Sequence, residues 1–188
     1  MMENLIYDRT ATDVSHWEQL RKKGYANMTS DERVEWNAGL KGAYTPSVDY
    51  NRVETAVASL SAALDAAGYS APSKIKTDWT LSDIPTEADL ERYIGNIATI
   101  RAALTVMPTT PQTPESMRFL TWAKANDIEK ILIDVDAMLQ SMLLILQHAG
   151  QPLFSAGYGL YPASTGEPLL AEDGQELLSE SGEELLYY

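Results

Sequence analysis

Residues 126–149 read NDIEKILIDVDAMLQSMLLILQHA, and they carry the longest helical pattern of the chain. The main apolar positions in this stretch are spaced 4, 3, 4, 3 and 4 residues apart, which is a heptad seam of three repeats. The seam consists of Ile128, Leu132, Val135, Leu139, Met142 and Leu146. Near residues 142–146 the pattern is apolar almost all round, so we expect other protein chain to surround the helix there.

Two interpretations of this seam are open. Three repeats are short for a coiled coil, and the same spacing is typical of a central core helix in a monomeric bundle. Alternatively, the helix is shared between subunits around an axis, and the six seam residues then form a subunit interface.

Start and stop signals divide the preceding residues into four further helices. We expect these helices at about 12–23, 30–39, 47–67 and 85–104. Thr29 and Glu32, three residues apart, match a capping box at the start of the second helix. Three prolines between residues 108 and 114 impose an extended linker before the fifth helix. The expected fold class is therefore mainly α, with a helical body of about five helices over residues 1–150.

Residues 151–188 form a second segment, within which residues 165–188 repeat with a period of eight. Glycine recurs at positions 166, 174 and 182, and a Leu-Leu pair begins three residues after each glycine. A turn such as Asp173-Gly174 favours a two-residue hairpin, so each repeat supplies one turn and one short strand. The paired leucines are Leu169, Leu170, Leu177, Leu178, Leu185 and Leu186. The repeats predict a C-terminal β-meander with leucine rows on both faces.

Such a meander needs something to cover it. A lone three-stranded sheet is marginally stable, and here both faces require burial, either in a groove of the same chain or against symmetry-related copies. The six leucines are therefore candidates for a subunit or partner interface. A disordered acidic tail is the alternative, because this segment holds seven acidic residues and no Lys or Arg.

The composition excludes several classes of function. The 188 residues include 14 Lys and Arg against 27 Asp and Glu, for a formal net charge of -13. This acidity argues against binding to nucleic acid or to an anionic membrane surface. The absence of cysteine excludes disulfides and thiolate chemistry. No apolar run approaches the roughly 20 residues of a membrane span, and no secretory signal is visible. We therefore expect a protein of a reducing compartment, or of a particle assembled there.

Searching for reactive groups yields no motif. His16 and His148 are the two histidines, and neither has metal-ligand spacing to a second one. Asp134 and Asp136 lie two apart on a helix, so they cannot face one another as an acid–base pair. We expect no catalytic residue, no metal and no cofactor, and hence no enzyme, although a carboxylate pair assembled by the fold stays open. Burial is expected for the four tryptophans, with a stacked-aromatic sugar site as the alternative. They are Trp17, Trp36, Trp79 and Trp122.

Several segments resemble a known family. The carrying segments are Leu40-Lys41-Gly42-Ala43-Tyr44 with Asn51-Arg52-Val53, Lys76-Thr77-Asp78-Trp79 with Arg92-Tyr93, and residues 125–132. They are similar to small structural proteins of tailed bacteriophages and prophages of Gram-positive bacteria, found among tail, baseplate and fibre components. The resemblance covers about residues 5–135 and the terminal repeats, and it departs from the family pattern at Thr45-Pro46-Ser47. The family implies no catalytic residues.

From these observations we expect a virion structural protein, a tail, baseplate or fibre-attachment component assembled in the bacterial cytoplasm. Its expected partners are copies of itself, with a trimer favoured, and other virion proteins. Three alternatives are open: a head fibre or capsid decoration protein, a module that binds host cell-wall glycan, and an enzyme such as a cell-wall hydrolase.

Overall fold

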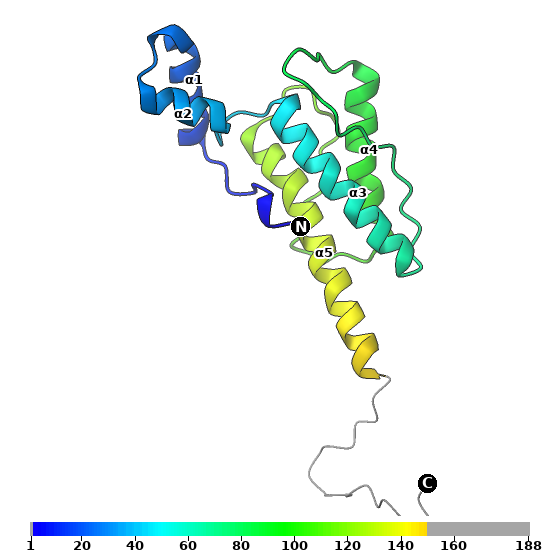
Figure 1. The fold of residues 1–188 in the computed structure, drawn as a ribbon. Coiled ribbons are helices and arrows are strands. Elements are labelled where there is room, and N and C mark those ends of the chain that lie inside the picture. The colour runs from blue at the N-terminus through cyan, green and yellow to red at the C-terminus, as the bar shows by residue number, and fades with distance from the viewer. Residues whose placement is uncertain (1, 150–188) are drawn as a thin grey trace, which may run out of the picture. The chain divides into compact units, whose positions relative to one another are not determined.

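The computed structural model describes residues 2–149, and the side chains of residues 2–145. In this part of the chain the fold is mainly α, with five α-helices (Figure 1), as the sequence predicts. They are α1 Ala11–Lys23, α2 Ser30–Ala38, α3 Asn51–Ala66, α4 Glu87–Ala103 and α5 Trp122–Ala149. Shorter helical turns cover Met2–Asn4, Tyr25–Asn27 and Pro46–Tyr50. The predicted β-meander and its six leucines lie outside the described residues.

Polar caps fix where the helices begin. The predicted capping box of α2 is present, since the Thr29 side chain accepts from the Glu32 amide and the Glu32 side chain accepts from the Thr29 amide. Thr86 with Asp89 makes the same reciprocal pair at the start of α4. The fifth helix starts at Trp122, four residues before the predicted start. Thr121 caps this helix, since its Oγ1 accepts from the Lys124 amide at 3.3 Å. The sequence does not indicate this cap, because a capping box has Glu or Gln three residues after the threonine and this chain has Lys124 there.

These caps predict a loss of stability in acid. The Thr86 hydroxyl, followed by the Thr86 amide, lowers the pKa of Asp89 below its usual 3.8. The Lys23 ammonium and the Thr29 amide lower the pKa of Glu32 below its usual 4.5. A carboxylate with a lowered folded pKa stabilises the protein fully above its unfolded value and loses that contribution as the pH falls through the folded value. The urea midpoint should therefore stay level from about pH 7 to 5 and fall below about pH 4.5.

The Asp89→Asn variant provides the control for this titration. Its amide cannot ionise, so its midpoint should fall less steeply between about pH 4.5 and 3 than that of the unchanged chain. Equal acid sensitivity of the two proteins would contradict a stabilising role for the ionised cap.

The long helices α3, α4 and α5 all begin at the same end of the body (Figure 1). Glu54, in the first turn of α3, accepts from Arg92, in the second turn of α4, at 2.6 Å. Arg52, also at the start of α3, pairs at 2.8 Å with Glu129 near the start of α5. The three helices therefore run parallel, which requires each connection to return along the full length of the body.

The two return connections are residues 67–86 and 104–121, and neither contains a helix. The proline-bearing linker predicted from the sequence is part of the second one. Arg101 of α4 donates to the carbonyl oxygen of Pro111 at 2.7 Å and holds this segment against the helix. Because no strand ladder is present in the described residues, the buried polar groups of these extended segments need partners on side chains.

The core lies between the three parallel helices and contains most of the heptad seam. Ile128, Leu132, Val135 and Leu139 are completely buried with residues of α3 and α4 in one cluster. Met142 is half-buried at the edge of that cluster, and the side chain of Leu146 lies outside the described residues. For the four buried residues the core interpretation applies, because no surface is left on them for a second subunit.

Residues 10–43 form an arm that carries α1 and α2 and stands beside the parallel helices (Figure 1). The arm has a small core of its own, formed by Leu20, Met28, Leu40 and Ala43 with the half-buried Trp17 and Trp36. Gly42 closes its base against the first turn of α1, where a Cβ atom would lie 2.0 Å from the backbone oxygen of Asp13. The arm is therefore a separately packed element joined to the body through residues 9 and 44.

Candidate functional site: buried charge networks

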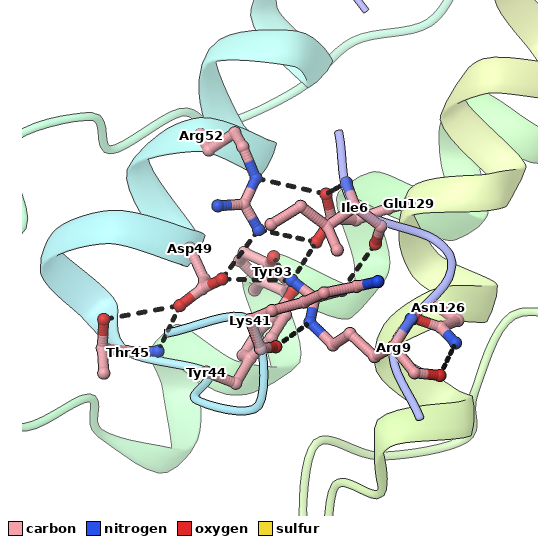
Figure 2. A network of polar contacts seen from close by, with 10 residues as sticks. All are labelled: Ile6, Arg9, Lys41, Tyr44, Thr45, Asp49, Arg52, Tyr93, Asn126 and Glu129. Carbon is pink, nitrogen blue, oxygen red and sulfur yellow. Dashed lines mark hydrogen bonds and ion pairs between the residues drawn. The ribbon is translucent and has the colours of Figure 1, made fainter. Parts of the chain in front are cut away.

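Four charged side chains meet where the arm joins the body (Figure 2). Arg9 precedes α1, Asp49 and Arg52 stand at the start of α3, and Glu129 lies on the second turn of α5. The Arg9 and Glu129 side chains are 2% and 0% exposed. Arg9 Nη2 donates to Glu129 Oε1 at 2.7 Å and to Asp49 Oδ1 at 3.1 Å. Arg52 Nη2 donates to the same two oxygens at 2.8 and 2.7 Å.

Backbone groups complete this network. Glu129 Oε2 accepts from the amide of Ile6 at 2.6 Å and from Arg52 Nε at 3.2 Å, so each of its oxygens has two donors. Asp49 Oδ2 accepts from the amide of Thr45 at 2.6 Å. Arg9 Nε donates to the carbonyl oxygen of Lys41 at 3.1 Å. The network therefore ties both ends of the arm to α3 and α5.

The two carboxylates favour the charged form of Arg52. Burial by itself lowers the pKa of Arg52, but the hydrogen bonds and charges of Glu129 and Asp49 outweigh this effect, and the net pKa is raised. Burial also raises the pKa of Tyr44, and the nearby Glu129 charge raises it further. The Tyr44 hydroxyl is 2.7 Å from that of Tyr93, so this pair stays neutral beside the charges. Two cations and two anions thus balance inside the protein.

A second network surrounds Glu54 of α3, whose side chain is 1% exposed. Arg92 of α4 makes a two-pronged ion pair with it, at 2.6 and 2.8 Å. The amide of Lys76 and the indole nitrogen of Trp79 donate to the same carboxylate at 2.7 and 3.0 Å. Glu54 of α3 therefore binds both the first return connection and Arg92 of α4, and so attaches that connection to the two helices.

Three asparagines attach extended backbone to the helices in one common way. Each accepts from the amide and donates to the carbonyl oxygen of a single residue, as a neighbouring strand would. Asn51 does so with Trp79 at 2.9 and 2.8 Å, and Asn126 does so with Arg9 at 3.0 and 2.9 Å. Asn96 does so with Lys74 at 3.2 and 2.8 Å. These amides replace the missing sheet partners of the extended segments.

The chemistry open to these networks is structural. General acid–base catalysis needs a carboxyl group within reach of a substrate proton. Glu129 and Glu54 are instead enclosed, and their oxygens accept from arginines and backbone amides. Glu129 and Glu54 therefore act as anchors for the chain. Asp49 and Glu129 are a pair of carboxylates that the fold brings together, and they converge on the same two arginines.

Neither network was predicted from the sequence, although a signal existed for part of each. Glu129 lies between Ile128 and Leu132 on the apolar face of its helix, and Glu54 follows Val53 on the apolar face of another. An acidic residue on such a face is expected to have a buried cationic partner. Arg9 and the asparagines carry no comparable signal, because their role depends on distant segments.

The other candidates for chemistry lie apart from these networks. His16 is exposed and pairs at 3.0 Å with Glu35 on the neighbouring helix, while the side chain of His148 lies outside the described residues. Asp134 pairs with Lys130 one turn away on α5. No cluster of three metal-binding side chains occurs among the residues that the structure describes.

The aromatic residues divide into a buried and an exposed group. Trp79, Tyr50 and Tyr93 are buried and pack against one another with ring centroids 5.6 and 4.8 Å apart. Trp122 is 42% exposed and Phe119 is 92% exposed, at the end of the body where the parallel helices begin. The buried rings are closed to a sugar, so a glycan-binding surface would have to use the exposed ones.

Phe119 also has a strained backbone, and this leads to a prediction. Its φ angle is 52°, and it is the one non-glycine residue with positive φ among those described. Asparagine adopts this conformation more readily than phenylalanine, so Phe119→Asn should raise the free energy of unfolding by about 1 kcal/mol. Urea denaturation measures this change. Leu81→Asn, at an 89% exposed position without positive φ, is the control and should give no gain; a destabilised Phe119→Asn protein would refute the argument.

Comparison with known proteins gives no relative: no family model, curated protein or solved structure matches the chain. No helix among residues 2–149 has the length and apolar character needed to cross a membrane.

Proposed function

We propose that the chain is a structural component of a tailed bacteriophage particle, placed in the tail, baseplate or fibre attachment. The proposal begins from the resemblance of its sequence segments to such proteins. The observation that carries it further is where these segments lie in the fold. Arg52 and Glu129 belong to the first buried network, and the Tyr44 ring lies under Arg9 of that network. Trp79 and Arg92 belong to the second. The residues that carry the resemblance are thus the ones that build the scaffold.

The architecture supports an assembly role in a second way. The arm is a separately packed element beside the parallel helices, so a single chain offers more than one surface to neighbours. The arm is held at both ends by ionised groups that are shielded from solvent, and such buried pairs are screened by salt much less than surface pairs. A part that must keep one shape within a particle benefits from contacts of this kind.

The test is the location of the chain in purified particles. Particles from an induced host that carries the gene are banded on a density gradient and analysed by mass spectrometry, then labelled with gold-coupled antibody. The proposal expects the chain in the particle band and gold at the tail tip or fibres. Gold on the head would favour the alternative of a head fibre or decoration protein, and absence of the chain from the band would refute the proposal.

The glycan-binding alternative is tested separately. It rests on the exposed aromatic residues Phe119 and Trp122, and it predicts that the purified chain sediments with host cell walls. Trp122→Ala should abolish that sedimentation if the indole contacts sugar, whereas Tyr25→Ala, at a 48% exposed ring on the arm, should not.

A further inference from the structure

Helix α5 is much longer than the helices it packs against. It has 28 residues, whereas α3 and α4 have 16 and 17. At 1.5 Å per residue, α5 is about 42 Å long and its neighbours about 25 Å. Figure 1 shows that the C-terminal part of α5 runs on past both neighbours. We call residues 140–149 the projecting end.

The burial pattern marks the same boundary. Leu139 is completely buried, and it is the last buried residue of α5 among those whose side chains are described. Met142 and Leu143 are half-buried against the core, and Ile145 is 67% exposed. A short helical segment beyond its neighbours gains little from its own backbone hydrogen bonds, so it needs side-chain contacts to persist in water.

The charge pattern restricts the partner. Residues 137–149 contain no Asp, Glu, Lys or Arg, in a chain of net charge -13. Two copies of this chain each carry a net negative charge and repel one another overall, but the projecting end brings no like charges together. A partner selected by charge would find nothing to pair with on this segment.

The spacing of the apolar residues points to a second copy. Leu139, Met142 and Leu146 continue the heptad seam, with Ile145 beside it. A heptad seam is self-complementary, because equivalent residues meet around a symmetry axis when copies associate in parallel. The first four seam residues are buried in the core of each subunit. Met142 is only half-buried against that core, so part of its side chain can contact a second copy.

We propose that copies of this chain associate in parallel through the projecting end of α5, with Met142 and Ile145 against their equivalents. This deepens the proposed function, on which it rests, by naming the partner as the chain itself and the contact as one short segment.

The test is the solution mass of the full chain, measured by light scattering or sedimentation at about 10–100 μM. The unchanged chain should be an oligomer, with a trimer favoured. Ile145→Glu places a like charge from each copy at the axis, so its mass should fall to that of one chain, 20.8 kDa. The control Leu81→Glu alters an 89% exposed apolar side chain in a loop and should keep the mass of the unchanged chain. Circular dichroism should give the same helix content for all three proteins.

Two results would overturn the inference. One is a monomeric unchanged chain, and the other is an Ile145→Glu protein that keeps the full oligomeric mass. The variant Leu178→Glu, in the repeat, distinguishes a failure of the proposed α5 contact from a failure of the proposed particle role. If Leu178→Glu dissociates the oligomer and Ile145→Glu does not, the repeats hold the copies together, and the particle role stands without this contact.

Discussion

Glu129→Ala should cost about 3–5 kcal/mol of the free energy of unfolding, because it leaves two buried cations to share the single carboxylate of Asp49. Arg9 and Arg52 both donate to Glu129, and Arg9 is 2% exposed, so water cannot replace the lost carboxylate there. The amide of Ile6 also loses its acceptor. For a domain with a total stability of about 5–15 kcal/mol, the loss should be visible as a large decrease in the urea midpoint.

Glu35→Ala is the matched control for this prediction. Glu35 also accepts an ion-pair contact, from His16 at 3.0 Å, but its side chain is 50% exposed. Exposed pairs contribute little because water screens them and two side chains must be ordered, so this variant should unfold close to the unchanged chain. If the two variants unfold at the same urea concentration, the buried network is not a major source of stability. Glu129→Gln keeps the shape of the side chain and one acceptor oxygen, so its urea midpoint should lie between those of Glu129→Ala and Glu35→Ala.

Gly42→Ala should disrupt the arm while leaving the parallel helices folded. The new Cβ would lie 2.0 Å from the oxygen and 2.3 Å from the carbonyl carbon of Asp13, so the backbone of α1 must move. Overpacking of this kind typically costs about 1–3 kcal/mol, and here it falls on the small core that contains Leu20 and Met28. Hydrogen exchange should show loss of protection over 13–23 and 30–38, with protection in α3 to α5 retained.

The chain offers a control of opposite sign. Gly95 lies inside α4, and a Cβ atom there would meet nothing within 4 Å. Alanine is the better helix former, so Gly95→Ala should raise the free energy of unfolding by about 0.5–1 kcal/mol. An intact arm in Gly42→Ala would mean that α1 can shift without cost, and the arm would then be more loosely packed than the structure indicates.

Local patterns carried much of the fold. The spacing of apolar residues over 126–149 and the capping box of Thr29 and Glu32 predicted elements that the structure confirms. These signals are reliable because a cap and an amphipathic face are satisfied within a few residues of the same segment. The early start of α5 at Trp122 was missed because Thr121 caps it without an acidic companion.

The function of the seam was ambiguous in the sequence for a physical reason. A heptad pattern states that one face of a helix is buried, and it does not say whether the covering helices belong to the same chain. The fold resolves this for Ile128, Leu132, Val135 and Leu139, which are covered by α3 and α4. Association of copies remains a proposal for the projecting end, and the role of the repeats in residues 151–188 remains a prediction.

The amino-acid sequence by itself determined that this protein is mainly helical, that α2 starts after a cap at Thr29, and which helix faces are apolar, since these properties follow from neighbours in the chain. Only the tertiary structure decided that three helices run parallel and that Arg9, Asp49, Arg52 and Glu129 meet. Arg9 and Glu129 are 120 positions apart, and no local pattern relates them. Their pairing follows from the need of each buried charge for an opposite one, which is satisfied only after the helices have packed.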